Sequence, residues 1–281
     1  MKAVNTIARM STLVRMLKKE GKTIGFVPTM GYLHDGHLSL VKAAEKHTDV
    51  VVMSVFVNPA QFGPNEDFDK YPRDPKRDEV MAAQAGVDII FCPRSSEMYS
   101  EGYSTCVTVE GLSQVMCGRS RPEHFRGVTT VVAKLFGIVK PDIAYFGQKD
   151  AQQAAIIKKM ASDLNMDTEI KMMPIVRETD GLAMSSRNLY LSDAQRRDAT
   201  VLYRALKRAE SLIFAGERKA SVIKEDMKKM IVQKPAAKID YVAIVNPCDL
   251  KDLEIIAKDA LVALAVNFGK TRLIDNIIVE V

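Results

Sequence analysis

Two of the four histidines in this 281-residue chain stand three residues apart, in the segment His34-Asp35-Gly36-His37. An apolar run at residues 24–27 precedes them and periodic apolar residues follow from residue 38, so the segment is predicted to join a strand to a helix. A helix N-terminus carries partial positive charge and free N–H groups that bind phosphate. Two imidazoles placed there would contact a phosphate and stabilise the charge that develops during attack at an α-phosphate.

A second candidate site is the segment Met184-Ser185-Ser186-Arg187. Two hydroxyls, a run of backbone amides and a guanidinium suit the oxygens of a pyrophosphate group. Taken alone, the segment is better interpreted as a turn whose serines hydrogen-bond the local backbone. Its occurrence together with the histidine pair favours a binding site, and we expect the two segments to meet in one cleft.

The segment Gly147-Gln148-Lys149-Asp150 repeats the predicted order of strand, tight turn and helix. Lys149 could neutralise phosphate, whereas Asp150 could cap the helix that follows. Gln153 lies one turn further on and is expected to face the same cleft as Gln61. A buried carboxamide donates and accepts hydrogen bonds, which suits a hydroxy acid, although a single glutamine is more often a solvated side chain.

Several other polar residues are predicted to have no part in the chemistry. His47 and His124 each stand alone and are interpreted as surface or satisfied helix residues. The carboxylates Asp67, Asp69 and Asp74 could attract a metal ion, but a solvated loop is the better interpretation of their polar surroundings. The sequence therefore assigns no metal ligands.

Composition and charge exclude several classes of protein. The chain is 47% hydrophobic and 27% charged, with a net charge of +5, and its basic and acidic residues are mixed rather than gathered. No nucleic-acid-binding stripe is indicated. The four cysteines form no C-x-x-C pair, which favours reduced thiols in a cytoplasm. The longest apolar runs, residues 50–57 and 260–266, are too short to span a membrane and are interpreted as buried strands.

Alternating strand and helix patterns over the first 176 residues predict an α/β domain with a parallel sheet. Strands are expected at residues 24–27, 50–57, 87–91, 105–109, 143–146 and 168–176, the one at 105–109 lying at an edge. The polar stretch at residues 65–77 belongs to a long loop after the second of these strands. Such a loop lies where open α/β sheets bind ligands, and it is predicted to be a lid or binding loop.

Residues 177–281 are predicted to form a smaller α+β domain, with the boundary between residues 176 and 180. Ser192 and Gln195 form a capping box that opens one long helix to about residue 214. A basic helix at residues 221–232 and strands at 240–245, 261–268 and 273–281 follow. Asp275 and Glu280 within the last strand indicate an antiparallel sheet with one face in solvent.

Four motifs in order resemble those of the pantothenate synthetase family, the pantoate–β-alanine ligases of the cytidylyltransferase-like superfamily. They are Pro28-Thr29-Met30-Gly31 through His37, the segment 56–62 (FVNPAQF), the segment 145–150 (YFGQKD) with Gln153, and the segment 181–188 (GLAMSSRN). The resemblance covers essentially the whole chain. It implies a Rossmann-like N-terminal domain (1–176), a smaller C-terminal lid domain (177–281) and a homodimer.

The resemblance also implies an activity with small-molecule partners: ATP, pantoate and β-alanine, with no nucleic acid or membrane. Pantoate carboxylate attacks the ATP α-phosphate to give pantoyl adenylate and pyrophosphate, and β-alanine then displaces AMP. Mg²⁺ accompanies ATP. By motif match, catalysis would fall to His37, His34 and Lys149, and Gln61 and Gln153 would bind the organic substrates. The implied ATP-binding residues are Met30, Gly31, His34, His37, Gly147, Gln148, Lys149, Asp150, Val176, Met184, Ser185, Ser186 and Arg187.

Two alternatives to the ligase stay open at this point. One is another nucleotidyltransferase with the H-x-G-H motif, and the other is a nucleotide-binding module without catalysis. Gln61 and Gln153 favour the ligase over the first, and the intact His34, His37 and Lys149 set weighs against the second. Ala183 and Arg187 stand where some relatives carry a K-M-S-K-S loop, which disfavours tRNA aminoacylation. His37 is the family's assigned proton donor, but phosphate stabilisation would explain its position equally well.

Overall fold

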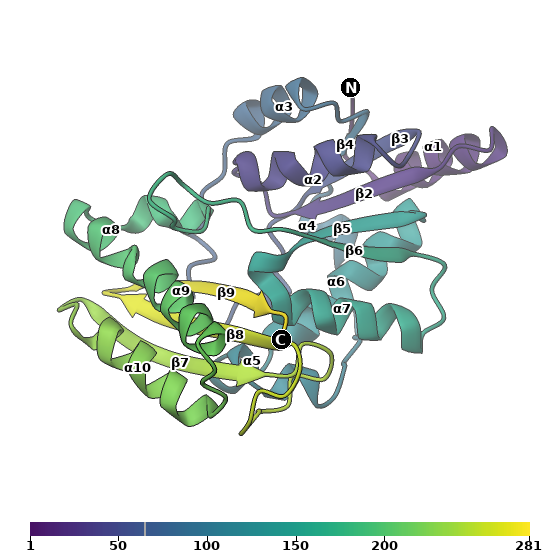
Figure 1. Cartoon of the computed structure of the whole chain (residues 1–281). Helices are drawn as coiled ribbons and strands as arrows, with labels where there is room; N and C mark the ends of the chain where they lie inside the picture. Colours follow the sequence, from purple (N-terminus) through teal and green to yellow (C-terminus); the bar gives the residue numbers. More distant parts are fainter. Residues whose placement is uncertain (65) are drawn as a thin grey trace.

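The computed structural model describes residues 1–64 and 66–281, so Asn65, the first residue of the predicted polar loop, lies outside the described part. Figure 1 shows a large sheet with its helices in the first part of the chain and a smaller sheet with its helices in the last part. The division into an α/β part and a smaller α+β part agrees with the predicted fold class.

The large sheet has six strands in the order β1-β4-β3-β2-β5-β6, and every neighbouring pair is parallel. Its strands are β1 (Lys2–Val4), β2 (Ile24–Thr29), β3 (Val50–Val55), β4 (Ile89–Phe91), β5 (Ile143–Gly147) and β6 (Glu169–Met173). The chain moves outward from β2 through β3 to β4 and later returns to add β5 on the other side of β2. The carboxyl ends of β2 and β5 therefore flank the point where the strand order reverses, where open α/β sheets bind ligands.

Helices cover both faces of this sheet, which is why its inner strands β2, β3, β4 and β5 are mostly apolar. Helices α1 (Ile7–Lys19), α6 (His124–Val139) and α7 (Ala151–Asp163) pack on one face around Phe26 and Phe91. Helices α2 (Asp35–Glu45) and α3 (Pro75–Gln84) pack on the other face around Met53 and Tyr145. The remaining short elements of this part are α4 (Ser95–Met98), α5 (Cys117–Ser120) and the 3₁₀ turns η1 (Pro59–Gln61), η2 (Leu112–Gln114) and η3 (Gln148–Asp150).

The small sheet is antiparallel, in the order β7-β8-β9, and helices cover one of its faces. After the 3₁₀ turn η4 (Ser186–Tyr190), its elements are α8 (Asp193–Ala199), α9 (Val201–Phe214), α10 (Ala220–Val232), β7 (Ala237–Val245), β8 (Ala260–Phe268) and β9 (Thr271–Val279). Val262, Leu264 and Val266 of β8 face α9 and α10. Leu261 and Ala263, on the opposite face, pack with Met116 and Ala151 of the first part.

The prediction of a solvent-exposed face on the small sheet is therefore wrong. Asp275 is 1% exposed and pairs with Arg177, while its neighbour Asn276 is 3% exposed. Sequence alone could not show this, because both faces are covered. Asp275 lies on the face under the helices and is paired with Arg177 of the linker, while the large domain covers the opposite face.

Two other expectations about secondary structure need correction, and one short strand was missed. Residues 105–109 form no strand, because the Thr130 hydroxyl accepts from Val107 N–H and the Thr129 hydroxyl donates to Val107 C=O, at 2.9 and 2.6 Å. The hydroxyls of these two α6 threonines therefore bond the backbone groups of Val107, which a neighbouring strand would otherwise bond. Strand β1 was not predicted, being only three residues long. The long helix after the confirmed Ser192 capping box is divided at Thr200 into α8 and α9.

Candidate active site

A cavity of about 990 Å³ opens at the carboxyl ends of β2 and β5 and extends to the small sheet. It brings together the segments that the sequence analysis singled out. Its lining includes Met30, His34, His37, Gln61, Gly147, Lys149, Asp150, Gln153, Val176, Met184, Ser185, Ser186 and Arg187. The predicted meeting of the histidine pair and the serine–arginine turn in one cleft is confirmed by this lining. Gly31 and Gln148 do not line the cavity.

Gly31 instead shapes the loop that carries the histidines. Its φ is +82°, and a Cβ there would come within 2.8 Å of Val55 and 2.9 Å of Asp78. Asp78, which is 2% exposed, accepts hydrogen bonds from the Tyr32 and Leu33 N–H groups, both at 2.8 Å. A buried carboxylate on α3 thus anchors the loop. Sequence reasoning missed Asp78 because it lies 41 residues beyond His37, in an ordinary helix.

The two imidazoles of the motif lie against each other, with ring centroids 4.0 Å apart. His34 N–H donates to His37 Nδ1 at 3.3 Å, so a neutral His37 carries its proton on Nε2 and can donate it to a ligand. Gly36 is required for packing, because a Cβ there would meet the His34 ring at 2.9 Å. The H-x-G-H spacing is thereby explained by the stacking of the first ring over the glycine.

The surroundings of both imidazoles favour the neutral form of each ring. Burial, and then the charge of Lys149, lower the pKa of His34 to about 4. Burial is also the first cause that holds the pKa of His37 well below its usual value, followed by His34 and Lys149. Negative charge brought into the cleft would act in the opposite direction and raise both pKa values.

The turn after β5 places a lysine at the same edge of the sheet. The Lys149 Nζ lies 3.6 Å from an Asp150 carboxylate oxygen, and the lysine side chain is 22% exposed. Asp150 makes no side-chain hydrogen bond to cap α7, so the simple capping role expected for it is not found. Gln148 is not part of the cavity lining, and its Nε2 donates to Asn276 Oδ1 at 3.3 Å.

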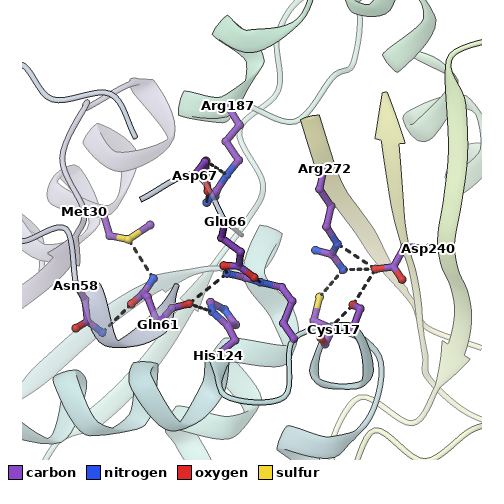
Figure 2. Close-up of polar contacts among 12 residues, drawn as sticks. Met30, Asn58, Gln61, Glu66, Asp67, Cys117, His124, Arg187, Asp240 and Arg272 are labelled. Atoms are coloured by element: carbon purple, nitrogen blue, oxygen red, sulfur yellow. Dashed lines mark hydrogen bonds and ion pairs between the residues drawn. The ribbon is translucent and has the colours of Figure 1, made fainter. Parts of the chain in front are cut away.

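Gln61 is 8% exposed and has its carboxamide fixed from two sides (Figure 2). Asn58 Nδ2 donates to Gln61 Oε1 at 3.1 Å, and Gln61 Nε2 points to the Met30 sulfur at 3.0 Å. Tyr99 in turn donates its hydroxyl to Asn58 Oδ1 at 2.7 Å. Gln61 is therefore a buried, oriented side chain rather than a solvated one. Asn58 and Tyr99 were not among the predicted site residues.

His124, interpreted from the sequence as a surface or satisfied helix residue, is a helix residue whose imidazole is hydrogen-bonded. It lines the cavity, and its Nδ1 donates to Gln61 C=O at 2.9 Å. Burial, followed by the charge of Arg121, lowers the pKa of His124 to about 4. Arg121 also donates to Gln61 C=O and pairs with Glu66. The first turn of α6 therefore forms one wall of the cavity.

Arg187 does not point freely into the cavity. It pairs through Nε and Nη2 with both carboxylate oxygens of Asp67, at 2.9 and 3.0 Å. Its guanidinium lies 5.3 Å from the ring centroid of Tyr71, and the Tyr71 hydroxyl is 3.4 Å from Ser186 Oγ. Asp67, interpreted from the sequence as a solvated loop residue, thus connects the loop after β3 to the serine–arginine turn. The same turn has its expected local role, since Ser185 Oγ accepts from Arg187 N–H.

Two successive glutamines at the start of α7 have different environments. Gln153 is partly exposed and lines the cavity, as predicted. Gln152 is 5% exposed and donates to Leu112 C=O and Val115 C=O at 2.9 and 2.8 Å. It also accepts from Cys117 N–H at 3.0 Å, so its role is to hold the α5 region.

At the ends of β2 and β5 the cavity is lined by the two imidazoles, Lys149 and Asp150. Within residues 1–64 and 66–281, no group of three or more His, Cys, Asp or Glu side chains is gathered in a way that could hold a metal ion. The donors are mostly N–H groups and cations, which suit anionic oxygens. Arrangement and chemistry together describe a site for a phosphate-bearing ligand beside a smaller polar molecule.

Comparison with known proteins decides the family. The model of the pantoate-beta-alanine ligase family matches residues 2–278. The chain belongs to this family. As a member of the pantoate–β-alanine ligase family, it is an enzyme of the ligase class. It is 59% identical to the pantothenate synthetase of Moorella thermoacetica over 281 residues, covering 100% of this chain and 99% of that one. The identity to that of Caldicellulosiruptor saccharolyticus is 57%, with 100% of both chains covered.

Solved structures of the ligase family agree in fold. The pantothenate synthetase from Thermus thermophilus superposes with a TM-score of 0.94 at 45% identity, covering 99% of each chain. A pantoate–β-alanine ligase from Francisella tularensis, complexed with beta-gamma ATP and beta-alanine, gives a TM-score of 0.80 at 33% identity, covering 99% of this chain and 97% of that one. In the part of this chain that the structure describes, no helix has the length and apolar character needed to cross a membrane.

Proposed function

We propose that this chain condenses pantoate with β-alanine to form pantothenate, through a pantoyl-adenylate intermediate and with conversion of ATP to AMP and pyrophosphate. One observation carries the proposal. A single cavity holds the imidazole pair, Lys149 and the serine–arginine turn near the two polar side chains Gln61 and Gln153. The first group suits a triphosphate and the second a hydroxy acid, and family membership supplies the identity of both.

In the first half-reaction a pantoate carboxylate oxygen attacks the ATP α-phosphorus and the bond to pyrophosphate breaks. The carboxylate needs this step because it is a poor acylating agent, whereas its mixed anhydride with AMP has a good leaving group. Lys149 and Arg187 supply positive charge for the phosphates, and His34 and His37 add N–H donors. Catalysis by these groups is positioning and charge stabilisation, with no covalent bond to the protein.

In the second half-reaction the neutral amine of β-alanine attacks the acyl carbon and AMP departs with the bonding electrons. The amine nitrogen then loses a proton, which leaves the amide. Gln61, fixed by Asn58, is proposed to contact both organic substrates, and Gln153 to contact pantoate. Acyl adenylates hydrolyse readily, so the loop that carries Asp67 and Tyr71 is proposed to limit access of water.

His37 is proposed to stabilise phosphate charge through Nε2–H rather than to begin the reaction as an imidazolium. Support comes from its depressed pKa, whose first cause is burial, and from the His34 N–H that occupies Nδ1. The remaining predicted ATP contacts are proposed for Met30, Gly147, Asp150, Val176, Met184, Ser185 and Ser186, which line the same cavity. Gly31 and Gln148 are proposed to shape the two turns rather than to contact ATP directly.

Mg²⁺ is proposed to enter as part of the nucleotide substrate. Mg²⁺ keeps several waters and is commonly bound by one or two carboxylates together with substrate phosphates. Asp150 at the cavity wall fits that limited role, and the absence of a three-ligand cluster within the described residues fits a metal carried by phosphate. Polarisation of phosphate oxygens is the chemistry that the ion supplies.

Three broader properties are proposed with the activity. Residues 1–176 would form the nucleotide- and pantoate-binding domain and residues 177–281 a lid, supported by separate hydrophobic clusters on the two sheets. Four free cysteines, two of them exposed, support a reducing cytoplasm. A homodimer, as the resemblance implies, is tested by the molar mass from light scattering on purified protein.

Pyrophosphate exchange into ATP tests the proposed activity against its alternatives. The ligase predicts exchange that requires pantoate and does not require β-alanine, and it predicts pantothenate as the product when β-alanine is added. Exchange with another phosphoryl acceptor but not with pantoate would identify a nucleotidyltransferase. ATP binding without exchange would leave a nucleotide-binding module and would contradict the proposal.

A further inference from the structure

The last strand of the small sheet reaches the turn that carries Lys149. In β9, Asp275 lies opposite Leu264 and Asn276 lies opposite Ala263 of β8. Because neighbouring residues of a strand face opposite sides of a sheet, Asp275 faces the helices with Leu264, and Asn276 faces the large domain with Ala263. Two successive side chains of β9 therefore serve two different contacts.

The Asn276 carboxamide holds the backbone of the phosphate-binding turn. Its Nδ2 donates to Gln148 C=O at 2.9 Å and to Lys149 C=O at 3.0 Å. Its Oδ1 accepts from the Gln148 side chain at 3.3 Å. Asn276 is 3% exposed, so these contacts are made away from solvent, where an unpaired carbonyl is costly. A carboxamide is needed, because this position requires donors for two carbonyls and an acceptor for one amide.

Asp275 fixes the strand that carries this carboxamide. Arg177, just after the end of the large sheet, donates to both of its carboxylate oxygens at 2.7 and 3.0 Å. Asp275 also accepts from Asn276 N–H at 2.7 Å, and the Arg177 guanidinium lies 4.1 Å from the Tyr203 ring centroid on α9. The linker, β9 and α9 thus hold Asn276 in place on the Lys149 turn.

We infer that Asn276 is a positioning residue, which acts through Lys149 although it belongs to the other domain. The inference rests on the proposed function, since it requires a triphosphate beside Lys149. By holding the Gln148 and Lys149 carbonyls, Asn276 sets the direction in which the Lys149 side chain leaves the turn. Placement of the lysine then depends on the small domain being seated against the large one.

A double-mutant cycle tests this link, with Asn276→Leu, Lys149→Ala and the double variant. Leucine keeps the approximate size of asparagine but has no hydrogen-bonding groups and adds no charge. The readout is the Kd of a non-hydrolysable β,γ-substituted ATP analogue, measured by calorimetry. We expect Asn276→Leu to weaken binding about tenfold in the native chain and less than about twofold in the Lys149→Ala background, since contacting partners are non-additive.

Asn246→Leu is the matched control, because Asn246 lies in the same domain, outside the cavity lining, and accepts from Cys248 N–H. It should leave the Kd of the analogue unchanged. An equal loss for Asn276→Leu in both backgrounds would reveal a merely structural effect and overturn the inference. No loss in the native chain would overturn it as well. If the leucine variant does not fold, Asn276→Ala passes through the same cycle.

Steady-state kinetics provide a second readout and separate this inference from the proposed activity. In pantoate-dependent exchange, Asn276→Leu should raise the KM for ATP while the KM for pantoate stays within about twofold. If the native chain shows no such exchange but the binding cycle is non-additive, the proposed activity falls and the link to Lys149 stands. If the native chain exchanges normally and the cycle is additive, only the positioning role falls.

Discussion

The two turns that open into the cavity are built in contrasting ways. The His34–His37 turn is anchored from within the large domain by Asp78 on α3, and its own two rings contact each other. The Lys149 turn is held by Asn276 from the small domain. The first turn is therefore preformed, whereas the second depends on how the two domains meet. Under the proposed function, the imidazoles would provide a fixed phosphate site, and Lys149 would complete it when the two domains are in contact.

The strongest test of the preformed turn is His37→Ala. We expect the rate of pantoate-dependent exchange to fall about a hundredfold or more, because one positioned donor to developing phosphate charge contributes roughly 3 kcal/mol. Single-turnover measurement of pantoyl adenylate locates the loss in the first half-reaction. His47→Ala is the matched control, since His47 is exposed just beyond the same helix. A near-normal rate for His37→Ala would remove this residue from the chemistry.

The adjacent glutamines of α7 sharpen the distinction between binding and support. Gln153→Ala should raise the KM for pantoate about tenfold, the size of effect expected for one polar contact to a substrate, without changing the melting temperature. Gln152→Ala should instead lower the free energy of unfolding by about 2–3 kcal/mol, because it leaves buried backbone groups unpaired. Steady-state kinetics and urea unfolding of both variants measure the two effects. Unchanged pantoate kinetics in the first variant would exclude Gln153 from the site.

The depressed histidine pKa values predict a pH dependence of stability. Burial, the first cause in each case, lowers the pKa of His34 and of His124 to about 4, below the unfolded value of about 6.5. The unfolded state therefore binds more protons between these values, and the stability present above pH 6.5 is lost as the pH falls toward 4. Urea unfolding at several pH values measures the slope. His124→Asn should make it shallower, and an unchanged slope would contradict the pKa assignment.

The smallest expected effect concerns the loop carboxylate that occupies Arg187. Asp67 pairs with Nε and Nη2 of Arg187, the two guanidinium donors that we propose for phosphate. Each of the two side chains is about a quarter exposed. Asp67→Asn should strengthen ATP binding by roughly two- to fivefold, the value of a partly exposed ion pair that no longer competes. Calorimetric titration with ATP measures the change. Asp69→Asn is the control, and weaker binding by Asp67→Asn would show that the carboxylate assists the nucleotide.

Most of what could be predicted from the sequence came from short-range patterns of residues. The strand–turn–helix order around His37 and Lys149 follows from short-range periodicity, and both turns are found at neighbouring strands. Contacts between distant segments could not be predicted in this way. Asp78, His124 and Asn276 each reach the site from a different element, and nothing in their immediate sequence distinguishes them from structural residues. Asp275 was assigned to a wet face because its partner, Arg177, is 98 residues away in sequence.

The central claim is that the His34–His37 turn and the Lys149 turn bind the same triphosphate, with pantoate beside it. A crystal structure with pantoate and a non-hydrolysable ATP analogue tests it most directly. We predict the α-phosphate within hydrogen-bond distance of His37 Nε2, phosphate oxygens on Lys149 and the serine–arginine turn, and pantoate against Gln153. A nucleotide bound outside this cavity, or with its phosphates turned away from His37 and Lys149, would contradict the account.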